Sequence, residues 1–575
     1  MDSVDKIEKI DRIVQYVNIV TNVLKPDTVI WCTGTLTEYN ELLELMVKDG
    51  TLISLSHNRY LHRSHPTDVA RTEQATYICA KNAEEVGPLN NFMSYDQAGD
   101  ILRRLLPNAY QGKTAYVVPY VMGSLESPWS QCGVEVTDSP YVAASMYLMT
   151  RVVPAEELKG RIVKSIHVSG NLDPKNKYIL HFPYNEESKF LDPDIISLNS
   201  AYGGNALLNK KCHALRIASV RGKKERWMAE HMLLLELITP DNESYFIAGA
   251  FPSASGKTNL AMIKLPEEYE KKGWKARLIG DDIAWIYPHN GRLHAINPEN
   301  GFFGVVPGTN ERTNPNAMNI MKQDVIFTNV GLTSEGEPWW EGLSPQESIT
   351  DWMGKTDDHE PGTKFAHPNS RFTAKLSNYP HLSERVNDPY GVPLDIILFG
   401  GRRTDTVPLI YEPYTWEDGV LAAATMGVET TAAADGPVGT IRRDPMAMRP
   451  FCGYNINDYF DHWLEMGEID HPPKIFYVNW FQKNSDGQFI WPGFGENIKV
   501  LEWAIQRTKN EEALEAIKTP LGYIPKEFPS NLFHIDQELW EKELESMQKF
   551  LESIGNSSLL PSLKRLKSRF ANIDV

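Results

Sequence analysis

The chain has 575 residues, which is too many for one hydrophobic core, so two lobes of a few hundred residues each are expected. Its formal net charge of -17 argues against a general nucleic-acid binder, because phosphate contacts would form against an unfavourable field. No apolar run reaches membrane-spanning length, and the N-terminal residues mix charges without the apolar core of a signal peptide. The five cysteines lie far apart without a CxxC pair, which indicates neither a structural zinc site nor a disulfide framework. A cytoplasmic location is expected.

From residue 114 to residue 149 the chain alternates strands with small residues, which indicates the packed body of a first lobe. Strands are expected at residues 28–31, 75–80, 115–122, 133–137, 141–149 and 212–219. Arg71 ends the polar stretch SHPTDVAR before the second of these strands, where its side chain faces either a cleft or solvent.

Paired glycines and paired lysines mark the segment 201–211, AYGGNALLNKK. Gly203 and Gly204 allow the backbone to approach a ligand closely, and Tyr202 offers a polar aromatic face beside them. In the simpler interpretation, Lys210 and Lys211 are a solvated pair. If they are buried in a cleft, repulsion and desolvation favour a neutral amine that can bind a metal or act as a base.

A helix is predicted at residues 225–237, ERWMAEHMLLLEL. It would carry His231 among apolar residues, where a lone histidine is usually part of the core. Because this segment closely precedes the phosphate-loop strand described next, His231 is also a candidate for the site.

The stretch 244–258 reads SYFIAGAFPSASGKT and has the order of a phosphate-binding loop. A buried strand, a loop of small residues, Gly256-Lys257-Thr258 and a helix follow one another. Backbone N–H groups would point at the anion, Lys257 would reach the terminal phosphates, and the Thr258 hydroxyl could hold a divalent cation. The standard pattern has a further glycine where this chain has Phe251, so the match to that pattern is incomplete.

Paired aspartates follow the next predicted strand, in the stretch ARLIGDDIAW. Asp281 and Asp282 offer the hard oxygen ligands that a divalent cation requires near a Gly-Lys-Thr loop. Two carboxylates at the end of a strand also occur in ordinary turns. The 24 residues from Lys257 to Asp281 fit a strand–helix–strand unit, which favours the metal-binding interpretation.

Three later segments carry further candidates. Residues 394–399 are expected to form a strand, and Arg402 just after it is placed to clamp a phosphate or carboxylate, or to lie solvated at a turn. Residues 428–440, VETTAAADGPVGT, suit a surface loop or a mobile lid. Aromatic residues gather in Gly/Pro turns at 478–481 and 489–497, where they belong to the core or enclose a base.

Together, these stretches closely resemble the GTP-dependent phosphoenolpyruvate carboxykinases. The motifs are FPSASGKTN, GDDIAW, INPENGFFGV, AHPNSRF, FGGRR and WPGFGEN, and the resemblance extends from about Ser64 to Asn497. We therefore expect an α/β fold, a two-lobed mixed α/β enzyme with a P-loop-like nucleotide-binding lobe and a mobile lid loop. The expected lobes are residues 1–222 and 223–575.

The resemblance implies that the chain interconverts oxaloacetate and phosphoenolpyruvate, with GTP phosphorylating the enolate left by decarboxylation. It implies Mn²⁺ at the catalytic site and Mg²⁺ or Mn²⁺ with the nucleotide. The expected partners are oxaloacetate, phosphoenolpyruvate, CO₂ and GTP or GDP, with no nucleic acid, no membrane and a monomeric chain.

Roles for individual residues also come from the resemblance. The metal ligands would be Lys211, His231, Asp282, Thr258 and, through water, Asp281. The residues around oxaloacetate and phosphoenolpyruvate would be Arg71, Tyr202, Gly203, Gly204, Ser253, Asn369 and Arg371. The nucleotide-binding residues would be Ala254, Ser255, Gly256, Lys257, Thr258, Asn259 and Arg402, with guanine at Phe481, Phe489, Phe494 and Asn497. The catalytic residues would be Ser255, Lys257, Arg371 and Arg402, and residues 429–438 would form the lid.

One residue departs from the family pattern. Family members commonly carry a reactive cysteine in the phosphate loop, and this chain has Ser255 there. The mechanism has no need of the thiol, so the resemblance still implies activity but puts the usual sensitivity to thiol reagents in doubt. Two alternatives stay open, a kinase that uses ATP and a nucleotide-binding regulator without turnover.

Overall fold

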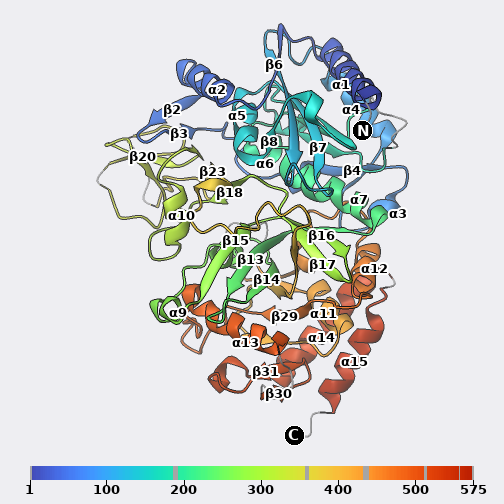
Figure 1. Ribbon diagram of the computed structural model, residues 1–575, viewed down its shortest axis with the longest axis vertical. Coiled ribbons are helices and arrows are strands. Elements are labelled where there is room, and N and C mark those ends of the chain that lie inside the picture. The colour runs from blue at the N-terminus through green and yellow to red at the C-terminus, as the bar shows by residue number, and fades with distance from the viewer. Residues whose placement is uncertain are drawn as a thin grey trace. The chain divides into compact units, whose positions relative to one another are not determined.

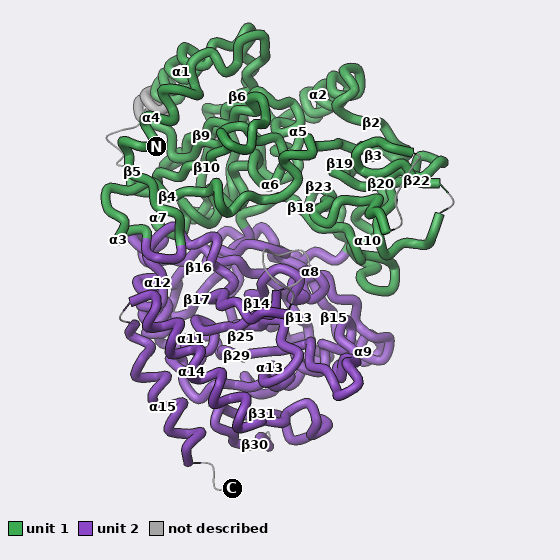
Figure 2. The backbone as a smooth tube through the Cα atoms, turned by 180° about the vertical axis from the view of Figure 1, so that it is seen from behind, with its two compact units in different colours: residues 1–86, 90–221, 298–380 green, residues 87–89, 222–297, 381–575 purple. Residues whose placement is uncertain are grey.

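The computed structural model describes residues 3–185, 192–346, 348–356, 362–430, 439–509, 515–555 and 557–572. The chain divides into two compact units, shown in different colours in Figure 2. The first unit contains residues 1–86, 90–221 and 298–380, and the second contains residues 87–89, 222–297 and 381–575. Both units combine helices with β-sheets, which confirms the predicted mixed α/β class. The lobe boundary predicted at residue 222 stays a prediction.

The first unit is built on a nine-stranded mixed sheet (Figure 1). It contains parallel pairs, such as β1–β6 and β7–β9, and antiparallel pairs, such as β6–β7 and β10–β11. In spatial order the strands are β1 (Thr28–Trp31), β6 (Thr114–Met122), β7 (Gln131–Thr137), β9 (Ile162–Val168), β11 (Ile195–Leu198), β10 (Tyr178–His181), β4 (Thr76–Ala80) and β5 (Phe92–Ser94), with β8 (Arg151–Val152) paired to β6.

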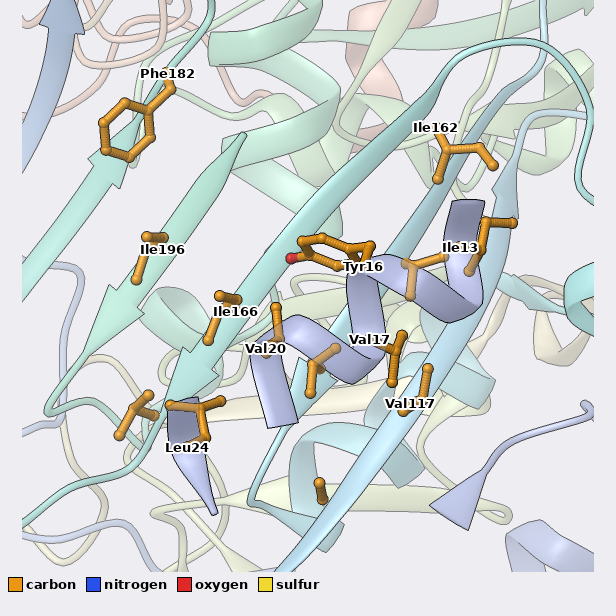
Figure 3. Close-up of a cluster of buried hydrophobic side chains, with 14 of the residues drawn as sticks. Ile13, Tyr16, Val17, Val20, Leu24, Val117, Ile162, Ile166, Phe182 and Ile196 are labelled. Carbon is orange, nitrogen blue, oxygen red and sulfur yellow. The ribbon is translucent and has the colours of Figure 1, made fainter. Parts of the chain in front are cut away.

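The N-terminal helix α1 (Ser3–Leu24) covers one face of this sheet. Ile13, Tyr16, Val17, Val20 and Leu24 recur at helical spacing and are all buried. Figure 3 shows them facing strand side chains that include those of β6 and β9. Burial of these side chains is the main force that holds α1 on the sheet.

Smaller sheets complete the first unit. The five-stranded sheet has the order β18 (Gly301–Val305), β23 (Arg371–Lys375), β19 (Val325–Thr328), β3 (Arg59–His62) and β2 (Leu52–Leu55). The three-stranded sheet has the order β21 (Pro338–Trp339), β20 (Gly331–Thr333) and β22 (Ile349–Thr350). The remaining helices of this unit are α2 (Leu36–Lys48), α3 (Ala83–Val86), α4 (Tyr95–Leu105), α5 (Pro140–Met149), α6 (Gly203–Ala206) and α10 (Pro315–Ile320). Helix α7 (Ala218–Glu225) begins in the first unit and ends in the second.

The second unit is built on a six-stranded sheet. Its order is β15 (Lys275–Gly280), β13 (Met232–Ile238), β14 (Ser244–Ala250), β25 (Ile396–Gly400), β29 (Lys474–Val478) and β26 (Ile410–Tyr411). A four-stranded sheet has the order β12 (Met228–Glu230), β16 (Ala284–His289), β17 (Arg292–Ile296) and β24 (Val392–Pro393). Two hairpins are formed by β27 (Gly427–Glu429) with β28 (Ile441–Arg443) and by β30 (Ala516–Lys518) with β31 (Tyr523–Pro525).

The α-helices of the second unit lie between its strands and after them in the sequence. They are α8 (Lys257–Ala261), α9 (Glu267–Lys272), α11 (Trp416–Ala424), α12 (Ile456–Met466), α13 (Asn497–Lys509), α14 (Gln537–Ser553) and α15 (Leu560–Ala571). The expected strand before the phosphate loop is confirmed as β14, and the helix after it as the short α8. Among the described residues, no helix combines the length and the apolar character needed to span a bilayer.

The helix predicted at residues 225–237 is wrong, because most of this segment forms strands β12 and β13, with His231 between them. Six of the seven residues of β13 are buried, since the strand lies between β14 and β15. An apolar run without a polar face fits a central strand as well as a buried helix.

Two predicted strands are helices. Residues 141–149 lie in α5, which starts where the Ser139 hydroxyl accepts from the Val142 N–H and Pro140 takes the first helical position. Residues 212–219 lie in the π-helix η5 (Asn209–Ile217) and the start of α7. All nine residues of η5 are buried, including five that are polar or charged, so its polar residues do not mark the solvent-exposed face by which a helix is usually identified.

Candidate active site

The phosphate loop connects β14 to α8 within the second unit. Ser255 is buried, whereas Ser253 and Ala254 are exposed. Gly256 has φ +93°, a left-handed conformation that glycine adopts without a Cβ penalty. This turn directs the chain into helix α8. The first three residues of the helix, Lys257, Thr258 and Asn259, are half-buried. The predicted order of strand, loop and helix is therefore confirmed, although the match to the standard sequence pattern is incomplete.

Asp282 joins the phosphate loop to His231. Lys257 Nζ donates to Asp282 Oδ1 at 2.6 Å, and His231 Nε2 lies 2.9 Å from the same oxygen. His231 Nδ1 lies 3.0 Å from the carbonyl oxygen of Ala447, which can only accept, so Nδ1 carries a proton. In the neutral ring this leaves the Nε2 lone pair as a metal ligand beside a carboxylate. Asp281, the other aspartate of the pair, is buried next to this group.

Arg402 follows β25 and reaches the phosphate loop. Its Nη2 and Nε donate to the carbonyl oxygen of Ala254 at 3.0 and 3.3 Å. Its guanidinium carbon lies 4.0 Å from the centroid of the Phe481 ring, a cation–π contact. Burial lowers the pKa of Arg402 and nearby Glu429 raises it, but a guanidinium remains charged at neutral pH. Arg402 thus presents a fixed cation beside the loop.

The residues predicted to bind guanine surround two turns of the second unit. The Phe481 and Phe489 rings pack edge to face with centroids 6.1 Å apart. Phe489 and Phe494 are 52% and 45% exposed, which is unusual for large apolar rings and suits stacking with a ligand. Asn497 is buried at the start of α13. Residues 431–438, which include most of the predicted lid, lie outside the described residues.

The substrate-binding residues predicted in the first unit come together from distant segments. The Tyr202 hydroxyl donates to the carbonyl oxygen of Asn369 at 3.1 Å and accepts from Arg371 Nε at 3.1 Å. The Arg371 guanidinium also lies over the Phe303 ring, 5.3 Å from its centroid. Tyr202 is fully buried, so its hydroxyl fixes the direction of Arg371.

Position 204 has no room for a side chain larger than that of glycine. A Cβ there would lie 2.5 Å from Cε1 of Tyr202 and 2.9 Å from Cγ of Arg71. Gly203 is also tightly packed, because a Cβ on it would lie 3.0 Å from the Phe303 ring. The structure therefore brings Arg71, Tyr202 and the paired glycines together.

Asp68 is a residue of this region that the sequence analysis did not single out. Its Oδ2 accepts from the backbone N–H groups of Ala201 and Tyr202 at 2.6 and 2.8 Å. Its Oδ1 accepts from Lys177 Nζ at 2.7 Å and from Asn205 Nδ2 at 2.8 Å. The carboxylate ties the Arg71 segment to the Tyr202 segment. A lone aspartate in a polar loop gives no sequence signal for this role.

Both paired lysines are buried in η5, as the metal-binding interpretation requires. Lys210 Nζ donates to Glu299 Oε1 at 2.6 Å, and both side chains are buried. Lys210 is therefore held by a carboxylate from the INPENG motif, and Lys211 is the predicted metal ligand. Within the described residues, no three His, Cys, Asp or Glu side chains gather as a metal site. The predicted ligands of the catalytic metal are His231, Asp282 and Lys211, of which only the first two belong to these four residue types.

Strand, phosphate loop, helix and paired aspartates define the second unit as the nucleotide-binding part of a P-loop phosphotransfer enzyme. The family model of the phosphoenolpyruvate carboxykinase C-terminal P-loop domain matches residues 227–569, and that of the phosphoenolpyruvate carboxykinase N-terminal domain matches residues 15–223. The chain belongs to the GTP-dependent phosphoenolpyruvate carboxykinase family.

Full-length relatives support this assignment. The phosphoenolpyruvate carboxykinase [GTP] of Thermoplasma volcanium is 51% identical, with 97% of each chain covered. The phosphoenolpyruvate carboxykinase [GTP] of Chlamydia pneumoniae is 46% identical over 96% of this chain and 97% of the relative. That of Anaeromyxobacter dehalogenans is 45% identical over 95% and 94%. The family resemblance inferred from the motifs is thereby confirmed, and family membership is consistent with the use of a divalent metal.

Proposed function

We propose that this chain interconverts oxaloacetate and GTP with phosphoenolpyruvate, GDP and CO₂. The observation that supports this most is the convergence of Lys257 and His231 on Asp282 in a chain 51% identical to a phosphoenolpyruvate carboxykinase [GTP]. A phosphate-loop lysine and an imidazole on one carboxylate suit phosphoryl transfer next to a divalent cation.

The metal ligands of the proposal are Lys211, His231 and Asp282 for Mn²⁺, and Thr258 for the Mg²⁺ or Mn²⁺ of the nucleotide, with Asp281 assisting through water. The proton on His231 Nδ1 supports this assignment, because it directs the lone pair of Nε2 to the side of Asp282. When bound, the cations would supply Lewis acidity toward the enolate and the transferring phosphoryl group.

The protein side chains perform the remaining tasks. Lys257 and Arg402 would neutralise phosphate charge. The guanidinium of Arg402 is oriented by its contact with the Phe481 ring and its hydrogen bond to the Ala254 carbonyl oxygen. In the first unit, Arg71 and Arg371 would bind the carboxylates of oxaloacetate and phosphoenolpyruvate, with Arg371 held by Tyr202. Ser253, Gly203, Gly204 and Asn369 complete the proposed substrate-binding set.

The decisive experiment measures phosphoenolpyruvate formation from oxaloacetate with GTP or ATP, with Mn²⁺ and Mg²⁺ present and after their removal by a chelator. We expect product with GTP, little with ATP and none without a divalent cation. Product with ATP alone would replace the guanine assignment with an ATP-dependent kinase. No product from folded, metal-loaded protein would refute the proposed activity and favour a binding protein without turnover.

A cytoplasmic monomer is part of the same proposal, supported by the family resemblance. Gel filtration at the mass of a single chain would support the monomer, and elution at twice that mass would contradict it.

A further inference from the structure

Trp491 lies in the second unit, six residues before Asn497, and contacts it directly. The indole Nε1–H of Trp491 donates to Oδ1 of Asn497 at 2.8 Å. Trp491 and Asn497 are only 8% and 5% exposed. The indole also packs against Phe528, with ring centroids 6.1 Å apart, and Phe528 packs on Phe533. Trp491 is therefore a fixed donor inside the protein.

The indole determines which way the amide of Asn497 faces. An indole nitrogen can only donate, so the atom facing it must be the amide oxygen and not the amide nitrogen. The amide nitrogen of Asn497 makes no hydrogen bond within the described residues. Asn497 thus offers two N–H donors at a position where its oxygen is already engaged.

We infer that Trp491 is a positioning residue that sets the preference for guanine over adenine by fixing the amide of Asn497; this rests on the proposed GTP-dependent function. Guanine carries the acceptor O6 where adenine carries a 6-amino donor. A fixed N–H₂ group pairs with O6 and opposes the 6-amino group donor to donor. Flipping the amide to accept from adenine would leave the buried indole N–H without an acceptor, so the flip is disfavoured.

The test compares three nucleotides by calorimetry in the presence of Mg²⁺, without turnover. They are GDP, ADP and the 5′-diphosphate of 2-aminopurine riboside, which lacks O6 and, like adenine, has an unprotonated N1 where guanine has N1–H. The change in each ratio on mutation, and not the wild-type ratio alone, therefore reports the contact of Asn497 with O6. We expect the wild-type chain to bind GDP about 10- to 100-fold more tightly than the other two, the range expected for a buried donor left unpaired.

The variant Trp491→Phe keeps an aromatic ring against Phe528 but loses the N–H donor together with part of the indole volume, as the control Trp416→Phe below also does. Both preference ratios should shrink by about 3- to 10-fold, while binding of the 2-aminopurine nucleotide changes less than about twofold, because released Asn497 no longer discriminates. Unchanged ratios, or equal weakening of all three nucleotides, would overturn the inference. The variant Asn497→Asp keeps an oxygen for Trp491 and removes the donor, so it should lose the preference for O6 with the indole in place.

The matched control is Trp416→Phe in the same unit. The Trp416 indole donates to the Trp463 carbonyl oxygen at 2.8 Å, so this variant loses an equivalent hydrogen bond and should leave both ratios unchanged. Wild-type protein that shows the expected ratios but makes no phosphoenolpyruvate would refute the proposed function alone. Wild-type protein that binds all three nucleotides equally would refute this inference whatever its activity.

Discussion

Replacing Asp68 by asparagine should loosen the Tyr202 segment and weaken binding of oxaloacetate and phosphoenolpyruvate. The buried carboxylate accepts two hydrogen bonds on each oxygen, one of them from the buried ammonium of Lys177. Asparagine has almost the same shape, but one of its two ends becomes a donor. Whichever end that is, two donors of the protein lose their acceptor, and the Lys177 charge loses its counterion.

The magnitude follows from the burial of the pair. The side chains of Lys177 and Asp68 are 4% and 0% exposed, so water cannot replace the lost partner. Removing one member of a buried ion pair costs about 3–5 kcal/mol. If that cost appears as local opening of residues 201–206, their amides should exchange hydrogen about 10²- to 10⁴-fold faster.

The assay is native-state hydrogen exchange followed by mass spectrometry, combined with steady-state kinetics. We expect faster exchange at Ala201 and Tyr202, a raised KM for oxaloacetate and little change in GDP binding. The control Asp100→Asn breaks a highly exposed pair with Arg103 and should change exchange at residues 201–206 by less than about twofold. Unchanged protection of residues 201–206 in Asp68→Asn would refute the reasoning.

Three further predictions concern side chains in both units. Gly204→Ala should lower kcat/KM for oxaloacetate by about 10²-fold, because the new Cβ displaces Tyr202. Arg402→Lys should lower kcat by about 10²-fold, because lysine keeps the charge but loses the fixed stack on Phe481, and single-turnover kinetics would measure it. Burial lowers the pKa of His62 to about 4, so the neutral ring is favoured in the folded state, and acid titrations of unfolding should detect this. Its contribution to stability should be complete above pH 6.5 and should fall by about 2 kcal/mol at pH 5, because the unfolded chain binds the proton first.

Each of these predictions has a control. Gly99→Ala lies in helix α4, where the nearest obstacle is the flexible Arg103 side chain, and should leave kcat/KM unchanged. Arg385→Lys removes a guanidinium over Phe246 away from the phosphate loop and should not alter kcat. His62→Phe keeps a ring to stack on Tyr141 and should flatten the pH dependence between 6.5 and 4. A wild-type kcat/KM in Gly204→Ala, or a wild-type kcat in Arg402→Lys, would contradict the respective prediction. An unchanged pH dependence of the free energy of unfolding in His62→Phe would contradict the third.

The sequence was most informative where local chemistry determines structure. Gly256-Lys257-Thr258 after a strand and the paired aspartates identified the phosphate loop before any contact was known. The sequence was least informative where burial hides periodicity. The segments of β13 and α5 are almost entirely buried, so their apolar runs do not distinguish a strand from a helix. In η5 the polar residues are buried as well, so they do not mark a solvent-exposed helix face.

Contacts between distant parts of the chain were also beyond sequence reasoning. Asp68 is 133 residues from its partner Ala201, and Tyr202 is 169 residues from Arg371. In neither pair does the local sequence around one residue identify its partner. By contrast, Lys257 follows β14 and Asp282 follows β15, and both strands pair antiparallel with β13, so their carboxyl ends lie at the same edge of the sheet. The expected strand–helix–strand order therefore agrees with their proximity.

The discontinuity of the first unit has a consequence for the order in which the chain can fold during synthesis. Strand β3 pairs in parallel with β19, with Arg59 opposite Val325, and β19 pairs in turn with β23. This sheet cannot close until residue 375 has left the ribosome, long after the N-terminal 222 residues have emerged. At about 5–20 residues per second, β3 and its buried Leu61 wait roughly 13 to 53 seconds for β19, which ends 266 residues later. A fragment that ends at residue 222 therefore exposes an open strand edge and should be prone to aggregation.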